Sequence, residues 1–317
     1  MSDDDKVVNI LDRAHQALLG SLNVMGEDRD RWFHLGQAQG ETLVIGPEHS
    51  LPKGLILQFR EPYRDGLTLP WPEAEKHVRF MPGKVTIWSG PTFSGKTAFL
   101  RQLMLSGMKQ GHNVLFISLE EEPIDVFREF ICCAALTRTP TKNQVEWALD
   151  YLTDKLLVFD STELLDPTVM LGIIRYTCAR HKITHVVIDS LMRLGLAIDD
   201  YEGQRKFGNL LGRVAKLSRA HLHVVAHPRK TANSRADMDL YDIRGAQDIV
   251  SQADLVATLE RKHEPDRRAD SVLRIWKQRG DCNWIGSMGL HYDQASRQLK
   301  FNPHDEPIRY LPEEAYT

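Results

Sequence analysis

The octapeptide GPTFSGKT, residues 90–97, limits the possible folds of this chain more than any other segment. It matches the pattern GxxxxGK[ST] at every fixed position, it follows the apolar run KVTIWSG of residues 84–90, and a segment with helical spacing follows it. Glycines let backbone N–H groups surround an anion, and the helix N-terminus adds its dipole. We therefore predict a strand, loop and helix that bind the phosphates of a nucleoside triphosphate.

Two positions of this loop and one distant acid carry specific expectations. Lys96 is expected to reach the β- and γ-phosphates of ATP, and the Thr97 hydroxyl to ligate Mg²⁺. Asp189 ends the apolar run HVVID, so its carboxylate should emerge at the edge of a sheet beside the loop and hold Mg²⁺ through water, unless it only caps the next turn. The residues expected to contact the nucleotide are Gly90, Pro91, Thr92, Phe93, Ser94, Gly95, Lys96 and Thr97.

Three consecutive acids, Glu120, Glu121 and Glu122, follow a second apolar run, NVLFISLE. We expect this strand to lie beside the phosphate-loop strand. A carboxylate at its end can orient and deprotonate the water that attacks the γ-phosphate, which favours Glu120 as the catalytic acid. The other two are expected to be solvated acids of a first helical turn, where negative charge is favourable.

The wider pattern predicts an α/β fold with a mostly parallel, twisted sheet. Strands and helices alternate, and the strand-like runs are apolar on both faces. The expected strands are 84–90, 113–120, 155–160, 184–190 and 222–227, and the expected helices are 96–110, 123–136, 141–153, 167–181 and 204–220. A polar, basic loop follows residue 228, and the last strands are expected to close the sheet edge in antiparallel order.

Composition narrows the possible classes of protein. Lys and Arg total 40 and Asp and Glu total 43, so the net charge of −3 excludes binding to nucleic acid through an overall basic surface. No apolar run is long enough to span a bilayer, and the start is acidic rather than signal-like. We expect a cytoplasmic protein without membrane contact, whose reduced, mostly packed thiols are Cys132, Cys133, Cys178 and Cys282.

The order of the motifs resembles the DnaB-type hexameric replicative DNA helicases with a RecA-like core, and is most similar to the phage primase-helicase and Twinkle branch. The resemblance covers roughly residues 60–302. After the phosphate loop, the segments that carry it are VLFISLEEEP, HVVIDSL, VVAHPRK, YDIRGAQDIVSQAD and RIWKQRGDCNWIG. It implies a RecA-like P-loop NTPase core, in a bacterial or phage-infected cell rather than an organelle.

The resemblance also implies roles for individual residues. His227 would sense the γ-phosphate, Arg279 would be an arginine finger that reaches a neighbouring subunit's nucleotide, and Lys277 would be a second cation beside it. From spacing alone, His227 is expected to be a capping or core histidine, and Lys277 and Arg279 are expected to be solvated residues on a strand. Contacts to single-stranded DNA would come from Arg229, Lys230, Arg235, Arg244 and Gly245, which otherwise read as a solvated face.

The implied function is that of a ring hexamer that uses ATP and Mg²⁺ to translocate on single-stranded DNA and unwind duplex during replication, with a primase or another replisome protein as a further partner. A RecA-like ATPase that binds DNA in recombination or helicase loading without unwinding it is the alternative, and a KaiC-like regulatory ATPase without DNA is a third option. We expect an N-terminal helix and linker region at 1–75, with a helix over 3–19, an ATPase core at 76–305 and a tail at 306–317.

Overall fold

The computed structural model describes residues 66–160, 166–191, 201–226, 247–266, 269–280, 282 and 284–316. The chain divides into two compact units, Met1–Gly66 and Leu67–Thr317. The second unit contains all the described residues except Gly66, so it takes in residues 67–75 and 306–317 together with the expected core. The helix expected at 3–19 lies outside the described residues.

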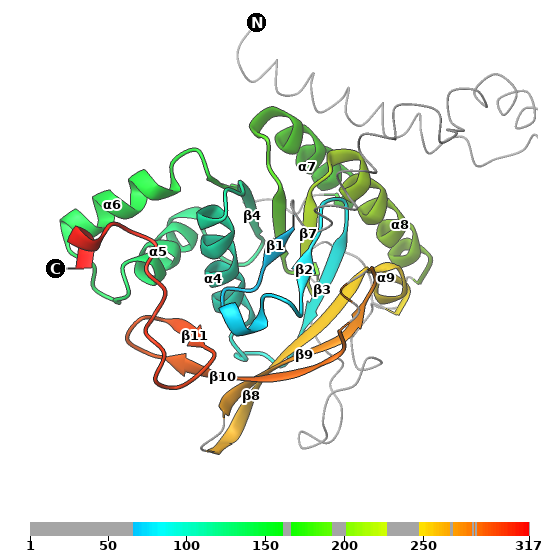
Figure 1. Cartoon of the computed structure of the whole chain (residues 1–317). Coiled ribbons are helices and arrows are strands. Elements are labelled where there is room, and N and C mark those ends of the chain that lie inside the picture. The colour runs from blue at the N-terminus through cyan, green and yellow to red at the C-terminus, as the bar shows by residue number, and fades with distance from the viewer. Residues whose placement is uncertain are drawn as a thin grey trace, which may run out of the picture. The chain divides into compact units, whose positions relative to one another are not determined.

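Nine strands of the described chain form one mixed sheet, in the order β11-β10-β9-β8-β3-β7-β6-β4-β5 (Figure 1). Strands β3 to β7 and the first part of β8 are parallel, and β9, β10 and β11 continue the sheet in antiparallel order. This confirms the predicted mostly parallel sheet with antiparallel C-terminal edge strands. The bounds are β3 Val85–Ser89, β4 Val114–Ser118, β5 Leu156–Val158, β6 His185–Asp189, β7 His221–Val225, β8 Leu255–Asp266, β9 Ala269–Gln278, β10 Gly286–Asp293 and β11 Gln298–Lys300.

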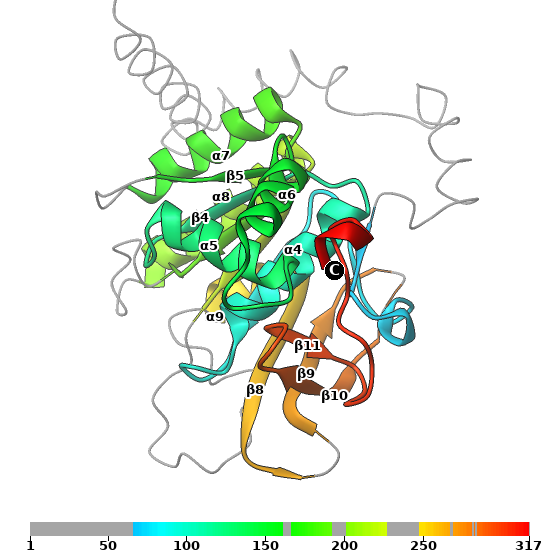
Figure 2. The same ribbon diagram turned by 90° about the vertical axis from the view of Figure 1, so that its left-hand side faces the viewer.

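Helices cover both faces of the sheet and form two separate hydrophobic cores. One core lies under α4, α5 and α6, and the other under α7, α8 and α9. Figures 1 and 2 show the first three helices together on one side, with the C-terminus beside α6. The helices are α4 Lys96–Lys109, α5 Pro123–Ala134, α6 Lys142–Leu152, α7 Pro167–His181, α8 Tyr201–Ser218 and α9 Gln247–Gln252.

Short elements complete the second unit at its two ends. A two-stranded antiparallel pair joins β1 (Leu67–Thr68) to β2 (Arg79–Phe80), with a 3-10 turn η2 (Pro72–Ala74) between them. A second 3-10 turn, η5 (Glu313–Tyr316), ends the described chain, and the Ala315 carbonyl accepts a hydrogen bond from the side chain of Gln144 on α6. The C-terminal residues are therefore tied to α6 of the same unit.

The neighbours of β4 differ from the prediction. We expected β4 beside β3, but β7 and β6 lie between them. The side chains of β4 are all buried, as its apolar run indicates. Periodicity shows that a strand is buried, but it carries no information about which strands lie beside it, because later strands can enter the sheet between earlier ones.

Candidate nucleotide-binding site

The phosphate loop lies between β3 and α4, and glycine is required at both of its fixed Gly positions. Gly90 has φ 147°, and a Cβ there would lie 2.1 Å from the Leu259 carbonyl oxygen on β8. Gly95 caps α4 in the left-handed region with φ 90°. The loop therefore curls tightly before the helix, which directs free N–H groups of the first turn of α4 toward the space that a phosphate would occupy.

Lys96 is folded back onto the loop that carries it. Its Nζ donates hydrogen bonds at 2.8 Å to the carbonyl oxygens of Gly90 and Pro91, and lies 3.5 Å from the Ser94 hydroxyl. Burial lowers the pKa of Lys96 to about 8, against the opposing effect of the Asp189 and Glu120 carboxylates. An ammonium held in this way can exchange carbonyl partners for phosphate oxygens, whose charge would stabilise it further.

Thr97 and Asp189 meet as the sequence predicts. The Thr97 hydroxyl donates a hydrogen bond at 2.6 Å to Oδ2 of Asp189, the last residue of β6. Burial raises the pKa of the Asp189 carboxyl, and the bond from Thr97 opposes this shift. A hydroxyl and a carboxylate are hard oxygen donors, and Mg²⁺ is usually held by few protein ligands with water and phosphate oxygens, so these two residues fit the ion.

Glu120 reaches the same site from β4. The strand ends at Ser118, so Glu120 lies in the following loop, where it is exposed and Oε1 accepts a hydrogen bond at 3.0 Å from the Ser190 hydroxyl. Glu121 differs from the prediction. Its side chain is 35% exposed, but it lines the cavity described below and accepts a hydrogen bond from the buried guanidinium of Arg101, a contact between distant residues that no local pattern predicts.

A cavity of about 600 Å³ joins these groups. Residues 92–97 of the loop line it together with Glu120 and Asp189. The sequence analysis assigned no role to several other lining residues, among them Glu121 and four residues that no motif marks, three of which come from the C-terminal strands and the turn between them. These four are Arg101, Arg261, Tyr292 and Arg297.

The two predicted trans-acting cations lie outside this cavity. Lys277 donates hydrogen bonds from Nζ to the carbonyl oxygens of Val250 and Ser251, at 2.9 and 2.8 Å, and Arg279 donates at 3.0 Å to that of Ser251. Both side chains thus lie at the C-terminal end of α9, where positive charge is favourable. Burial, followed by the charge of Arg279, lowers the pKa of Lys277.

The remaining predicted site residues lie outside the described part of the chain. They are the γ-phosphate sensor and the DNA-contacting group, His227, Arg229, Lys230, Arg235, Arg244 and Gly245.

The fold and the loop together define a P-loop ATPase with a RecA-like core. The family model for the KaiC ATPase matches residues 75–283, more than half of the chain, so the protein belongs to this ATPase family. Within the described ranges, no helix has the length and apolar character needed to cross a bilayer.

Two solved structures show the same fold at low sequence identity. The ATPase domain of G40P is 15% identical with a TM-score of 0.67, covering 80% of this chain and 99% of that one. A DnaB-like replicative helicase, described with its interactions with primase, is 15% identical with a TM-score of 0.67, covering 94% of this chain and 76% of that one. The resemblance to DnaB-type helicases is therefore confirmed at the level of the fold.

Proposed function

We propose that this ATPase is a DNA helicase that assembles as a ring of six copies, translocates on single-stranded DNA and unwinds duplex during replication. The proposal extends the P-loop ATPase class with the motif order that resembles the DnaB-type helicases. A primase or another replisome protein is the proposed further partner. The DNA contacts would come from Arg229, Lys230, Arg235, Arg244 and Gly245, and His227 would couple them to the γ-phosphate.

The position of Lys277 and Arg279 is the observation that carries the proposal. Neither lines the cavity of its own chain, and both extend from the end of β9 toward α9. The cations that line the cavity within its own chain are Lys96, Arg101, Arg138, Arg261 and Arg297. This separation supports a nucleotide site shared by two copies, in which one copy holds the triphosphate and the other adds the charge that speeds hydrolysis.

The described residues have distinct proposed tasks in hydrolysis. The Lys96 ammonium would bind the β- and γ-phosphates, and Thr97 and Asp189 would hold Mg²⁺, which neutralises charge on the phosphate oxygens when bound. Glu120 would orient the attacking water and accept its proton, with its carboxylate held by Ser190. Most of the rate enhancement would come from positioning and fixed charge.

A strand-displacement assay on forked DNA, with 5′ and 3′ tails compared, tests the proposal. We expect ATP-dependent release of one strand for one tail polarity, and closed six-fold rings by negative-stain microscopy with an ATP analogue and an oligonucleotide. Lys96→Ala should abolish both hydrolysis and unwinding, because the buried ammonium faces the phosphate site. Normal ATP turnover in that variant would refute the site.

The same experiments distinguish two other candidate functions, of which the regulatory ATPase is the one that the KaiC family match supports. A RecA-like ATPase that binds DNA without unwinding it would show DNA-stimulated hydrolysis, helical filaments or open rings, and no released strand. A regulatory ATPase without DNA would hydrolyse ATP at a rate indifferent to oligonucleotide. Either result would replace the helicase proposal and leave the nucleotide site unchanged.

A further inference from the structure

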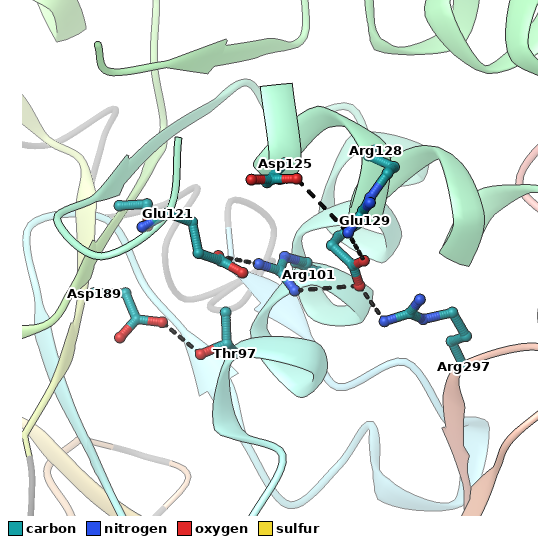
Figure 3. Close-up of polar contacts among 9 residues, drawn as sticks. Thr97, Arg101, Glu121, Asp125, Arg128, Glu129, Asp189 and Arg297 are labelled. Carbon is teal, nitrogen blue, oxygen red and sulfur yellow. Dashed lines mark hydrogen bonds and ion pairs between the residues drawn. The ribbon is translucent and has the colours of Figure 1, made fainter. Parts of the chain in front are cut away.

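Arg101 occupies an unusual place beside the candidate site. It lies on α4 one turn after Thr97, its side chain is only 7% exposed, and its guanidinium lines the nucleotide cavity. One terminal nitrogen donates a hydrogen bond to the Glu121 carboxylate, and the other lies 3.7 Å from Oε2 of Glu129 (Figure 3). A buried cation thus lies between two acids that belong to different elements.

The ion pairs continue beyond Arg101. Glu129, on α5, also accepts a hydrogen bond from Arg297, which lies in the turn between β10 and β11 and lines the same cavity. Figure 3 shows the Glu129 carboxylate between Arg101 and Arg297. We call the series Glu121, Arg101, Glu129 and Arg297 the charge chain; the side chains of Arg101 and Glu129 are 7% and 12% exposed, and those of Glu121 and Arg297 are 35% and 25% exposed. It connects α4, the loop after β4, α5 and the C-terminal edge of the sheet.

Stability alone is a poor reason for such an arrangement. Removing charged groups from water is costly, and a buried ion pair is often no more stabilising than apolar side chains of similar volume. What buried ion pairs supply is a defined geometry, because a planar guanidinium meets carboxylates in few orientations. The charge chain is therefore better explained by the geometry that it imposes, and its Glu121 end lies next in sequence to the proposed catalytic acid Glu120.

That end is the loop after β4, which carries Glu120. The loop is anchored by the amide of Leu119, which donates at 2.8 Å to the Asp189 carbonyl, and by the amide of Glu121, which donates at 3.0 Å to the Ser118 hydroxyl. The contact from Arg101 adds a side-chain anchor at Glu121, next in sequence to Glu120. It also places a positive charge beside an acidic run, which offsets repulsion between neighbouring carboxylates.

We propose that Arg101 is a positioning residue for Glu120, acting through Glu121 to hold the loop after β4 so that the Glu120 carboxylate is fixed toward the nucleotide cavity. This inference rests on the proposed role of Glu120 in ATP hydrolysis. It predicts that breaking the Arg101–Glu121 contact slows the chemical step. Both residues line the cavity, but the Arg101 guanidinium is held by Glu121 and Glu129, so nucleotide binding should change little.

The adjacent acids Glu121 and Glu122 provide a matched pair for the test. Glu121→Gln keeps the shape and removes the charge that Arg101 holds. We expect its kcat for ATP hydrolysis to fall about 10²-fold, the loss that a small misplacement of a catalytic group produces, with KM changed by less than about three-fold. Glu122→Gln changes an exposed acid outside the cavity lining and should keep wild-type kinetics.

The arginines offer a second matched pair. Arg101→Lys keeps the charge but loses the planar fork that spans two carboxylates, so it should show the same loss of kcat. Arg128→Gln removes an arginine that also lies near Glu129, at 3.6 Å, but is 67% exposed and absent from the cavity lining, so it should be neutral. The double variant Arg101→Lys/Glu121→Gln should lose no more than the worse single variant, because the two residues act as one unit.

Steady-state ATPase assays, titration with a fluorescent ATP analogue and thermal unfolding would be measured on the full chain. Three results would overturn the inference. The first is a wild-type kcat in Glu121→Gln, and the second is an equal loss of kcat in Glu121→Gln and Glu122→Gln. The third is a greater loss of kcat in Glu121→Gln than in Glu120→Gln. If Arg101→Lys fails to fold, the comparison of Glu121→Gln with Glu122→Gln still tests the inference. Lys96→Ala distinguishes failure of the proposed function from failure of this inference. Full ATPase activity in Lys96→Ala would refute both. An inactive Lys96→Ala together with a fully active Glu121→Gln would refute only the inference.

Discussion

Arg279 is exposed at the end of β9, and in the single chain its guanidinium donates a hydrogen bond to the Ser251 carbonyl oxygen at 3.0 Å. If it acts on a neighbouring copy's nucleotide, Arg279→Ala should leave binding of an ATP analogue near the wild-type value. Hydrolysis should fall by about 10³-fold or more, the range measured for arginine fingers. Parallel analogue titration and phosphate-release assays check this.

A neighbouring arginine is the control for that experiment. Arg274 lies on β9, before Arg279 in the chain, with its guanidinium 5.0 Å from the ring centre of Trp276, so Arg274→Ala removes an equal charge that packs on this ring. It should retain hydrolysis. Wild-type turnover in Arg279→Ala would show that the trans assignment is wrong.

At this scale, the sequence predicted the positions of those residues that are placed by their neighbours along the chain. The loop from Gly90 to Thr97 takes its shape from its own glycines and the helix behind it, and Asp189 projects from the end of its strand. Glu121 could not be predicted in the same way. Its partner Arg101 lies 20 positions away along the chain, and a polar residue in a helical pattern reads as solvent-facing until its neighbours are known.

At the scale of elements, α6 shows how local chemistry sets a boundary. Thr141 and Gln144 form a capping box, with the Thr141 hydroxyl accepting from the Gln144 amide at 3.3 Å and the Gln144 side chain accepting from the Thr141 amide at 2.9 Å. Thr141→Ala should lower the free energy of unfolding by about 1 kcal/mol, the usual loss for a helix cap. Urea unfolding measures this. Thr139→Ala, an exposed substitution before the helix, should change it by less than about 0.5 kcal/mol.

For the molecule as a whole, three buried histidines lie together on β6 and β7, and their hydrogen bonds fit neutral rings. The His221 Nδ1–H donates at 2.8 Å to the Met81 carbonyl, which leaves Nε2 to accept from the Thr86 hydroxyl at 2.7 Å. The Trp88 indole donates at 3.2 Å to Nδ1 of His223, so Nε2–H of His223 donates at 3.1 Å to Nδ1 of His185. These ring nitrogens have assigned partners, and an added proton would break one of the bonds.

Stability should therefore depend on pH through these rings. Burial lowers the pKa of His221 to about 4 and those of His185 and His223 well below the ordinary value. Below about pH 6.5 the unfolded chain binds more protons than the folded one, so stability is lost as the pH falls toward the folded pKa. His221 alone should account for about 2 kcal/mol between pH 7.5 and pH 5.

Urea unfolding across that pH range checks this expectation. His221→Asn should show a lower stability at pH 7.5 but a shallower fall toward pH 5, because one of the buried rings is gone. His304→Asn, at an exposed position, should keep the wild-type slope. An unchanged slope in His221→Asn would contradict the assignment of the pH dependence to this ring.

The phosphate loop, the alternation of strands and helices and the antiparallel C-terminal strands could all be read from the amino-acid order, because each depends on residues a few positions apart. Three features could not be read in this way: the two strands that lie between β3 and β4, the Arg101 guanidinium between two acids, and the hydrogen-bonded contact between His185 and His223. Each of these depends on which distant segments meet when two hydrophobic cores form on opposite faces of one sheet. Local periodicity reports that a residue is buried, and only the packed chain decides what it is buried against.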